Sequence, residues 1–256
     1  MKKQISLILL AATCLSLTGC SHNNQKPKPA VNPTVAKRDN RVNPQAVIKR
    51  NLNRNNYVKS YRMTNIKQVN NKKPSSVSYC LGNVPMNLAT YLNKSKKPVM
   101  YIANGVIYMA AKNNLGKTVW LKQESENKAQ QTINNNAKTA NQYMNTLANP
   151  TLANLAEAKK TDSGYEVQIK NTKSNLKQIA KQYQAKKNVK LVEYSLKLNT
   201  DKKFNLTEFQ QVMAYSYKGK TQKQVLMLDQ IGKFDKLSVP SSVTKHAIDQ
   251  SKVRVK

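Results

Sequence analysis

The sequence predicts an α+β domain built on a strongly curved antiparallel sheet. Strand-like runs with alternating apolar residues occupy the first and last parts of the chain, and a helical stretch separates them. An Asn-Gly pair between two apolar runs marks a tight hairpin. We expect seven or more strands to follow one another antiparallel, and the twist of such strands predicts strong curvature.

The start of the chain predicts an export signal. Lys2 and Lys3 precede an apolar run from Ile5 to Leu17, which is too short to span a bilayer as a stable helix. Residues 1–19 are therefore interpreted as a signal peptide that is removed and takes no part in the fold.

The signal ends in a motif with a chemical role. Leu17-Thr18-Gly19-Cys20 resembles the lipobox of bacterial lipoproteins, in which the cysteine thiol receives a diacylglyceryl group and becomes the new N-terminus. The resemblance implies lipidation of Cys20 and attachment to the cell membrane on its extracytoplasmic face. A soluble secreted protein with an incidental cysteine is the alternative.

Two flanking segments lack the apolar residues needed for a core. Residues 20–43 are rich in Asn, Lys, Pro and Gln and predict a disordered basic tether. Residues 245–256 predict a basic flexible tail, which leaves 44–244 for the folded domain. Cys80 is the one cysteine left there, so we expect no internal disulfide and a small buried side chain in a strand.

The elements of the domain follow from local periodicity. Pro44 suits the first position of a short amphipathic helix, and Asn149-Pro150 separates two helices in a stretch rich in Ala and Asn. In order, we expect a helix from 44, strands at 61–69, 77–81 and 86–91, a hairpin of 99–103 and 106–110, a strand at 118–121, two helices within 124–160, a strand at 165–169, a helix at 176–186, and strands at 189–198, 209–217 and 225–228.

The hairpin is the most specific of these predictions. Asn104-Gly105 supplies the two positive φ angles of a tight turn, which pairs Tyr101 with Tyr108 on one face. Four apolar residues form the other face: Met100, Ile102, Ile107 and Met109. Because both faces are apolar, we expect each of them to be covered.

The layout also resembles a known family. Ser60-Tyr61-Arg62-Met63, the Tyr101 to Tyr108 hairpin, Trp120, the helical middle and a last hairpin ending at Val239-Pro240 are similar to LolA/LppX-like lipoproteins of bacteria over about residues 44 to 240. The resemblance implies a half-barrel whose sheet wraps around helices, with a concave apolar cavity that carries a lipid or a lipoprotein acyl chain. It transfers no individual ligand contact.

We expect the Met/Ile face of the hairpin to line that cavity. Met100, Ile102, Ile107 and Met109 offer adaptable apolar walls without polar tips, which suits acyl chains. The alternative is a dry core, in which the same face packs on the helices of residues 129–160.

The sequence argues against catalysis. His22 falls in the tether and His246 in the tail, so no Ser-His-Asp or Cys-His arrangement forms in the domain. The carboxylates are too few and scattered for a calcium site, and zinc has no ligand set. Four glycines fall at predicted turns: Gly105, Gly116, Gly164 and Gly219. We therefore expect no enzyme, no metal and no cofactor.

The charge is strongly basic. Lys and Arg number 44 and Asp and Glu 12, which gives a net charge of +32. Export argues against a nucleic-acid partner, and no nucleic-acid-binding motif occurs. Anionic lipid headgroups and anionic wall polymers such as teichoic acid are the nearer polyanions. The alternative is that the lysines only keep the protein soluble.

Two functions are therefore expected. The first is a membrane-anchored lipoprotein that binds or carries a lipid or another apolar ligand in a concave cavity. The alternative is a non-enzymatic surface protein that docks on anionic wall polymer or lipid through its basic surface.

Overall fold

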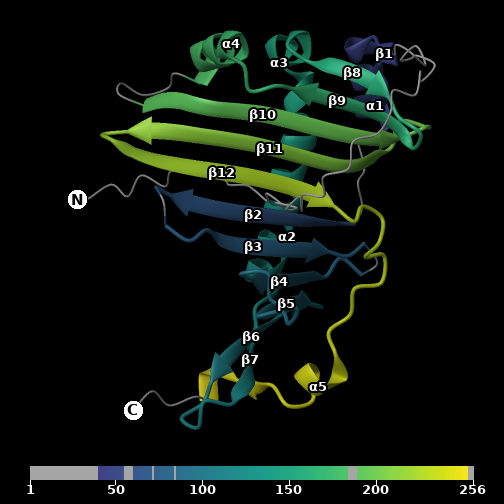
Figure 1. The fold of residues 1–256 in the computed structure, drawn as a ribbon. Helices are drawn as coiled ribbons and strands as arrows, with labels where there is room; N and C mark the ends of the chain where they lie inside the picture. The colour runs from purple at the N-terminus through teal and green to yellow at the C-terminus, as the bar shows by residue number, and fades with distance from the viewer. Residues whose placement is uncertain (1–39, 55–59, 71, 84, 184–188, 253–256) are drawn as a thin grey trace, which may run out of the picture.

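A computed structural model describes residues 40–54, 60–70, 72–83, 85–183 and 189–252 (Figure 1). The strands are β1 (Arg41–Val42), β2 (Tyr61–Val69), β3 (Ser75–Leu81), β4 (Leu88–Leu92), β5 (Met100–Ala103), β6 (Val106–Lys112), β7 (Thr118–Glu124), β8 (Glu157–Lys160), β9 (Gly164–Ile169), β10 (Val189–Asp201), β11 (Leu206–Tyr217), β12 (Lys220–Asp229) and β13 (Ile248–Asp249). The helices are α1 (Pro44–Arg54), α2 (Glu126–Met144), α3 (Pro150–Asn154), α4 (Lys173–Tyr183) and α5 (Ser241–Thr244), with two 3₁₀ turns, η1 (Thr146–Ala148) and η2 (Gln250–Lys252).

A single large sheet dominates the described residues. Its thirteen strands lie in the order β1-β8-β9-β10-β11-β12-β2-β3-β4-β5-β6-β7-β13. All neighbouring pairs in these ranges are antiparallel except β13 with β7, which is parallel. The strands of the last third of the chain, β10 to β12, insert between β9 and β2, so the two halves of the sequence share one sheet.

The expected strongly curved, LolA/LppX-like half-barrel is wrong. The sheet is open and twisted, and the fold is dominated by the sheet rather than by an α+β layout in which strands wrap around helices (Figure 1). Strong curvature needs bulges or glycine kinks inside strands. Among the described strands, register shifts occur within the β10–β11 pair, and Gly164 at the start of β9 is the one glycine. The rotation between neighbouring strands therefore accumulates as twist.

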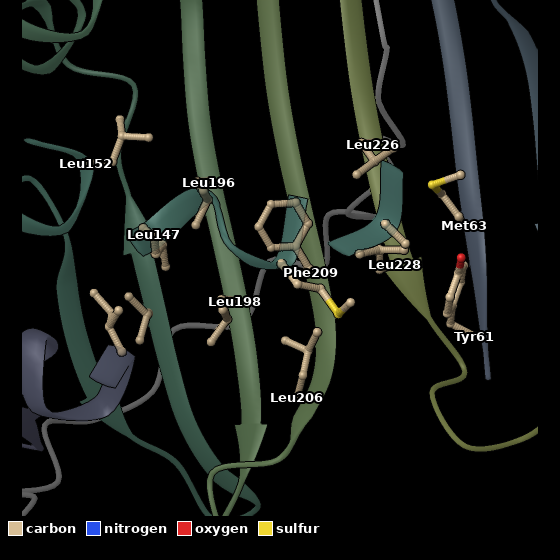
Figure 2. Packing of buried hydrophobic residues seen from close by; sticks show 14 of the residues in the cluster. Tyr61, Met63, Leu147, Leu152, Leu196, Leu198, Leu206, Phe209, Leu226 and Leu228 are labelled. Carbon is tan, nitrogen blue, oxygen red and sulfur yellow. The ribbon is translucent and has the colours of Figure 1, made fainter. Parts of the chain in front are cut away.

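The main core lies between one face of the sheet and the helices. α1 contacts β8 and β9, α4 contacts β10, and α2 contacts β3, β5 and β6. Figure 2 shows the apolar side chains that the strands contribute to this face, among them Leu198, Phe209, Leu228 and Met63. Phe209 is fully buried, and its ring centroid lies 6.5 Å from that of Tyr143 on α2. We call this the helix-side face.

The opposite face carries a second apolar cluster. Tyr101 and Trp120 lie with ring centroids 5.5 Å apart, next to buried Cys80. The segment after β12 covers them, with Val243 of α5 buried and Phe234 half-buried in the cluster. Both faces of the hairpin are therefore covered by the chain itself.

The predicted hairpin is confirmed. Asn104 and Gly105 both have positive φ, at 51° and 74°, and the register pairs Tyr101 with Tyr108. The pairing positions depend only on the turn and its flanking residues, which is why the sequence alone sufficed.

The two flanks are described in part. The predicted signal peptide, residues 1–19, and most of the predicted tether, residues 20–43, lie outside the described residues, as do residues 253–256. Within the described part, Arg41–Val42 pair with β8, and Ile248–Asp249 pair with β7 at the other edge of the sheet.

Candidate functional site

The four cavity candidates lie together in the main core. Met100 pairs with Met109 and Ile102 with Ile107 across the β5–β6 hairpin. Ile102 and Ile107 are buried, and the two methionines are half-buried against the same cluster, which also contains Ile133 of α2. None of the four lines the three depressions beside α4 and β10, beside Met86 and α2, or around β1 and β8.

The other singled-out residues form no catalytic arrangement in the described part of the chain. Cys20 and His22 lie outside it, and His246 is exposed. Cys80 is buried, and this burial raises the pKa of its thiol to about 11, so little thiolate exists at neutral pH. Within the described ranges, no three His, Cys, Asp or Glu side chains gather closely enough to hold a metal ion. No helix there has the length and apolar character to cross a bilayer.

One end of the sheet concentrates basic residues. Because neighbouring strands are antiparallel, the β2–β3, β4–β5 and β11–β12 turns fall at the same end as the start of β10. These strands are consecutive in the sheet, and this end lies where β10, β12 and β3 begin in Figure 1. We call residues 67–70, 72–75, 93–98, 189–190 and 217–221 the lysine rim. It holds nine lysines and no acidic residue: Lys67, Lys72, Lys73, Lys94, Lys96, Lys97, Lys190, Lys218 and Lys220.

Asparagines fix the turns that present these lysines. Asn70 has a positive φ of 50°, and its side-chain Oδ1 accepts from the backbone N–H of Thr221 at 2.8 Å. Its own N–H donates to the Thr221 carbonyl at 2.7 Å, so the β2–β3 turn is tied to the β11–β12 turn. Asn93 likewise has positive φ, and its Oδ1 accepts from the N–H of Ser76 at 3.1 Å. Six of the rim lysines thus lie in short turns, and Lys67, Lys190 and Lys220 lie near the ends of strands.

The acidic residues lie elsewhere. Six lie toward the opposite ends of the strands: Glu124, Glu126, Asp162, Asp201, Asp229 and Asp235. Four more lie on the face opposite the helices, Glu157, Glu166, Glu193 and Glu208, and Asp249 lies on the edge strand β13. Several of these are paired, as Asp229 is with Arg62 at 2.6 Å and Glu193 with Lys223 at 2.7 Å. The described acidic residues therefore lie away from the lysine rim, whereas lysines occur at both ends of the strands.

Exposed apolar residues accompany the rim lysines. Among the large exposed hydrophobic side chains, Val69 and Leu92 are each 41% accessible, Tyr217 46% and Val192 36%. Strand alternation places Val69, Leu92 and Tyr217 on the helix-side face, in the same rows as buried Met63, Leu88 and Phe209. The ends of these rows are exposed to solvent. α4 reaches this end of the sheet beside the start of β10.

A groove beside the rim combines the same two kinds of residue. It has a volume of about 500 Å³ between α4 and the start of β10, and we call it the α4 groove. Three lysines line it, and the other lining residues are apolar or aromatic: Lys173, Lys177 and Lys190, with Leu176, Ala180, Val189, Leu191, Val192 and Tyr215. No acidic side chain lines it among the described residues.

The chain enters the sheet at the opposite end. The carbonyl of Asn40 accepts from the N–H of Lys160 at 2.8 Å, beside the β8–β9 turn. That turn lies next to Asp201, the last residue of β10, because Gly164 pairs with Asp201. Whatever precedes residue 40 is therefore connected far from the lysine rim.

Comparison with known proteins names no relative: no protein-family model matches the chain, and no curated protein matches it. The resemblance to LolA/LppX-like lipoproteins stays a prediction from the sequence.

Sequence reasoning missed the rim, although one signal was present. The tripeptide Lys-Lys-Pro occurs at 72–74 and again at 96–98, each time between two strands. Lysine pairs beside a proline in two separate turns indicate exposed basic turns, but only the strand order shows that they share an end.

Proposed function

We propose that this protein is a non-enzymatic component of the cell envelope, anchored to the membrane through lipidated Cys20 on the extracytoplasmic face. In this proposal the lysine rim docks on an anionic surface, either anionic lipid or wall polymer. The observation that carries it is the absence of any acidic residue among nine rim lysines.

Geometry makes these lysines act as a group. Neighbouring strands are about 4.8 Å apart, so the seven adjacent strands of the rim span roughly 29 Å. The Debye length at physiological salt is about 8 Å, so lysines on neighbouring strands contribute to one shared positive potential. A lysine near an anionic membrane surface contributes about 1 kcal/mol to binding.

The test removes rim charge and compares the result with a control variant of the same net charge. The chain beginning at residue 20 carries Cys20→Ser, so that no acyl chain contributes, and binding is measured to phosphatidylglycerol vesicles and to teichoic acid. Lys72→Gln with Lys96→Gln and Lys97→Gln should weaken binding about 100-fold, since three charges account for roughly 3 kcal/mol. The control removes three exposed lysines from the opposite end, with Lys202→Gln, Lys203→Gln and Lys236→Gln.

Two outcomes would overturn the docking proposal. Equal weakening in both variants would mean that only net charge matters. Binding of the unsubstituted chain that does not fall between low salt and 0.5 M would exclude an electrostatic surface, because the Debye length then shrinks to a few ångströms.

A second candidate function, binding of an apolar ligand, is favoured by the α4 groove. A volume of about 500 Å³ lies within the roughly 300–1,000 Å³ of small-molecule sites. Its apolar floor suits an acyl chain, and its lysines suit an acidic head group. This candidate places the ligand in the groove rather than at the Met/Ile face of the hairpin.

The groove can be blocked from α4. Protein purified from membranes is extracted with organic solvent, and co-purifying lipid is measured by mass spectrometry. Ala180→Phe should fill the groove and reduce the lipid content at least severalfold, whereas Gln178→Phe on an exposed position of the same helix should not. Equal lipid in all three proteins, or none in the unsubstituted one, would rule out this second function.

A further inference from the structure

The geometry of the lysine rim points to one partner in particular, an anionic lipid bilayer. We infer that Val69, Leu92, Val192 and Tyr217 insert into the headgroup layer while the rim lysines contact the anionic headgroups. The inference rests on the proposed docking function and specifies its surface.

The apolar residues are distributed among the lysines. They lie on four of the seven rim strands, Val192 on β10, Tyr217 on β11, Val69 on β2 and Leu92 on β4. Each of them is within two residues of a rim lysine along the chain. Lys218 also places its Nζ 5.5 Å from the ring centroid of Tyr217. Apolar and cationic groups are therefore interleaved along the rim, as expected for a surface that binds the membrane interface.

The side chains of the rim suit the headgroup layer of a bilayer. Tyrosine is enriched at membrane interfaces, where its ring lies among the headgroups and its hydroxyl stays hydrated. Lysine can bury its aliphatic stem along apolar surface while the ammonium group stays at the level of the phosphates. Valine and leucine lose contact with water when they insert, which contributes binding that salt does not screen.

Other partners explain less of the surface. A soluble wall polymer carries phosphates that lysines alone can bind, and it offers little apolar material for four exposed hydrophobic side chains. A second copy of the chain would bring nine lysines against nine lysines, which repel one another. A bilayer of anionic lipid offers both charge and hydrocarbon.

The experiment removes the apolar residues and keeps the charge. The chain beginning at residue 20 with Cys20→Ser is bound to vesicles of phosphatidylglycerol and phosphatidylcholine, and in parallel to soluble teichoic acid. Leu92→Ser with Tyr217→Ser should weaken vesicle binding about tenfold or more and leave polymer binding unchanged, because only the bilayer receives these side chains. The control is Met86→Ser with Ile248→Ser, two residues of similar exposure away from the rim.

A depth measurement checks the same inference independently. Leu92→Cys carries an environment-sensitive fluorophore, and buried Cys80 is a poor competitor for the label. Lipids with a nitroxide on the upper acyl chain should quench this label on anionic vesicles, while a label on Lys202→Cys at the opposite end should stay unquenched.

The outcomes separate the two proposals. Rim-dependent binding to polymer with no quenching at position 92 leaves the docking function intact and overturns the bilayer inference. Loss of vesicle binding in the Met86/Ile248 control to the same extent as in the Leu92/Tyr217 variant also overturns it. Absence of binding to both vesicles and polymer overturns the docking function itself.

Discussion

Glu166 shows how single residues hold the polar face of the sheet together. Its carboxylate lies 2.7 Å from Nζ of Lys159 and 3.1 Å from Nζ of Lys197, one on each neighbouring strand. Burial alone would raise the pKa of Glu166, but the hydrogen bonds and charges of the two lysines outweigh burial and lower it. One carboxylate thus ties β8, β9 and β10 across their shared face.

This pairing predicts an acid-sensitive contribution to stability. A carboxylate whose folded pKa is lowered stabilises the fold fully above its unfolded pKa and loses that contribution as the pH falls through the folded pKa. Unfolding in urea should therefore show that Glu166→Gln is less stable than the unsubstituted protein at pH 7. The difference should shrink as the pH falls from about 5 toward 3. Glu126→Gln, at the start of α2, is the control, and a pH-independent difference for Glu166→Gln would contradict the account.

Gly164 is required in the fold for a reason other than the turn that the sequence predicts. It was expected at a turn, and it does follow one, but its φ is not positive. A Cβ at this position would lie 2.0 Å from the carbonyl oxygen of Thr200 and 2.5 Å from the carbonyl carbon of Asp201. Glycine is therefore required by the close approach of β10, which no local pattern reveals.

At the scale of elements, the sequence predicted the features that depend on neighbouring residues and missed those that depend on strand pairing. The hairpin and the helix break at Asn149-Pro150 depend on neighbouring residues, and the side chain of Asn149 accepts from the N–H of Thr151 at 3.0 Å as a cap. β8 was missed because Glu157-Ala158-Lys159-Lys160 shows no apolar alternation. Its strand state comes from pairing with β1 and β9. The prediction of strong curvature was wrong for the same reason, because curvature depends on bulges and on strand pairing across the whole sheet.

The segment after β12 predicts an element-scale effect. Val243 covers the cluster that contains Trp120, which is the one tryptophan of the chain. Deleting residues 240–256 should shift tryptophan emission to longer wavelength and reduce the free energy of unfolding by at least roughly 1.5–3 kcal/mol, the contribution of one buried valine. Deleting only residues 253–256 is the control. Unchanged emission in the longer deletion would show that the cluster does not depend on this cover.

At the scale of the whole molecule, the net charge was readable from composition, but its placement was not. Lys67 and Lys190 are far apart in the sequence. They lie at the same end of the sheet because β10 to β12 insert beside β2. The candidate site therefore follows from strand order, which a single sequence does not specify. The pairing of Met100 with Met109 and of Ile102 with Ile107 could be predicted because it is local. The α4 groove could not, because it joins a helix to strands whose neighbours are set by the complete sheet.

The entry of the chain beside Lys160 has a mechanical consequence. If Cys20 is acylated, the protein would contact one membrane twice, through the lipid anchor and through the lysine rim. The point where the chain enters the sheet and the rim lie at opposite ends of β10, whose 13 residues span about 43 Å. The 20 residues from 20 to 39 reach at most about 66–72 Å, so both contacts can form at once. The anchor then supplies the rim with a high effective concentration of lipid, and a rim of weak intrinsic affinity suffices for continuous occupancy. Shortening this segment should therefore weaken the binding of the lysine rim to the membrane without changing any residue of the rim.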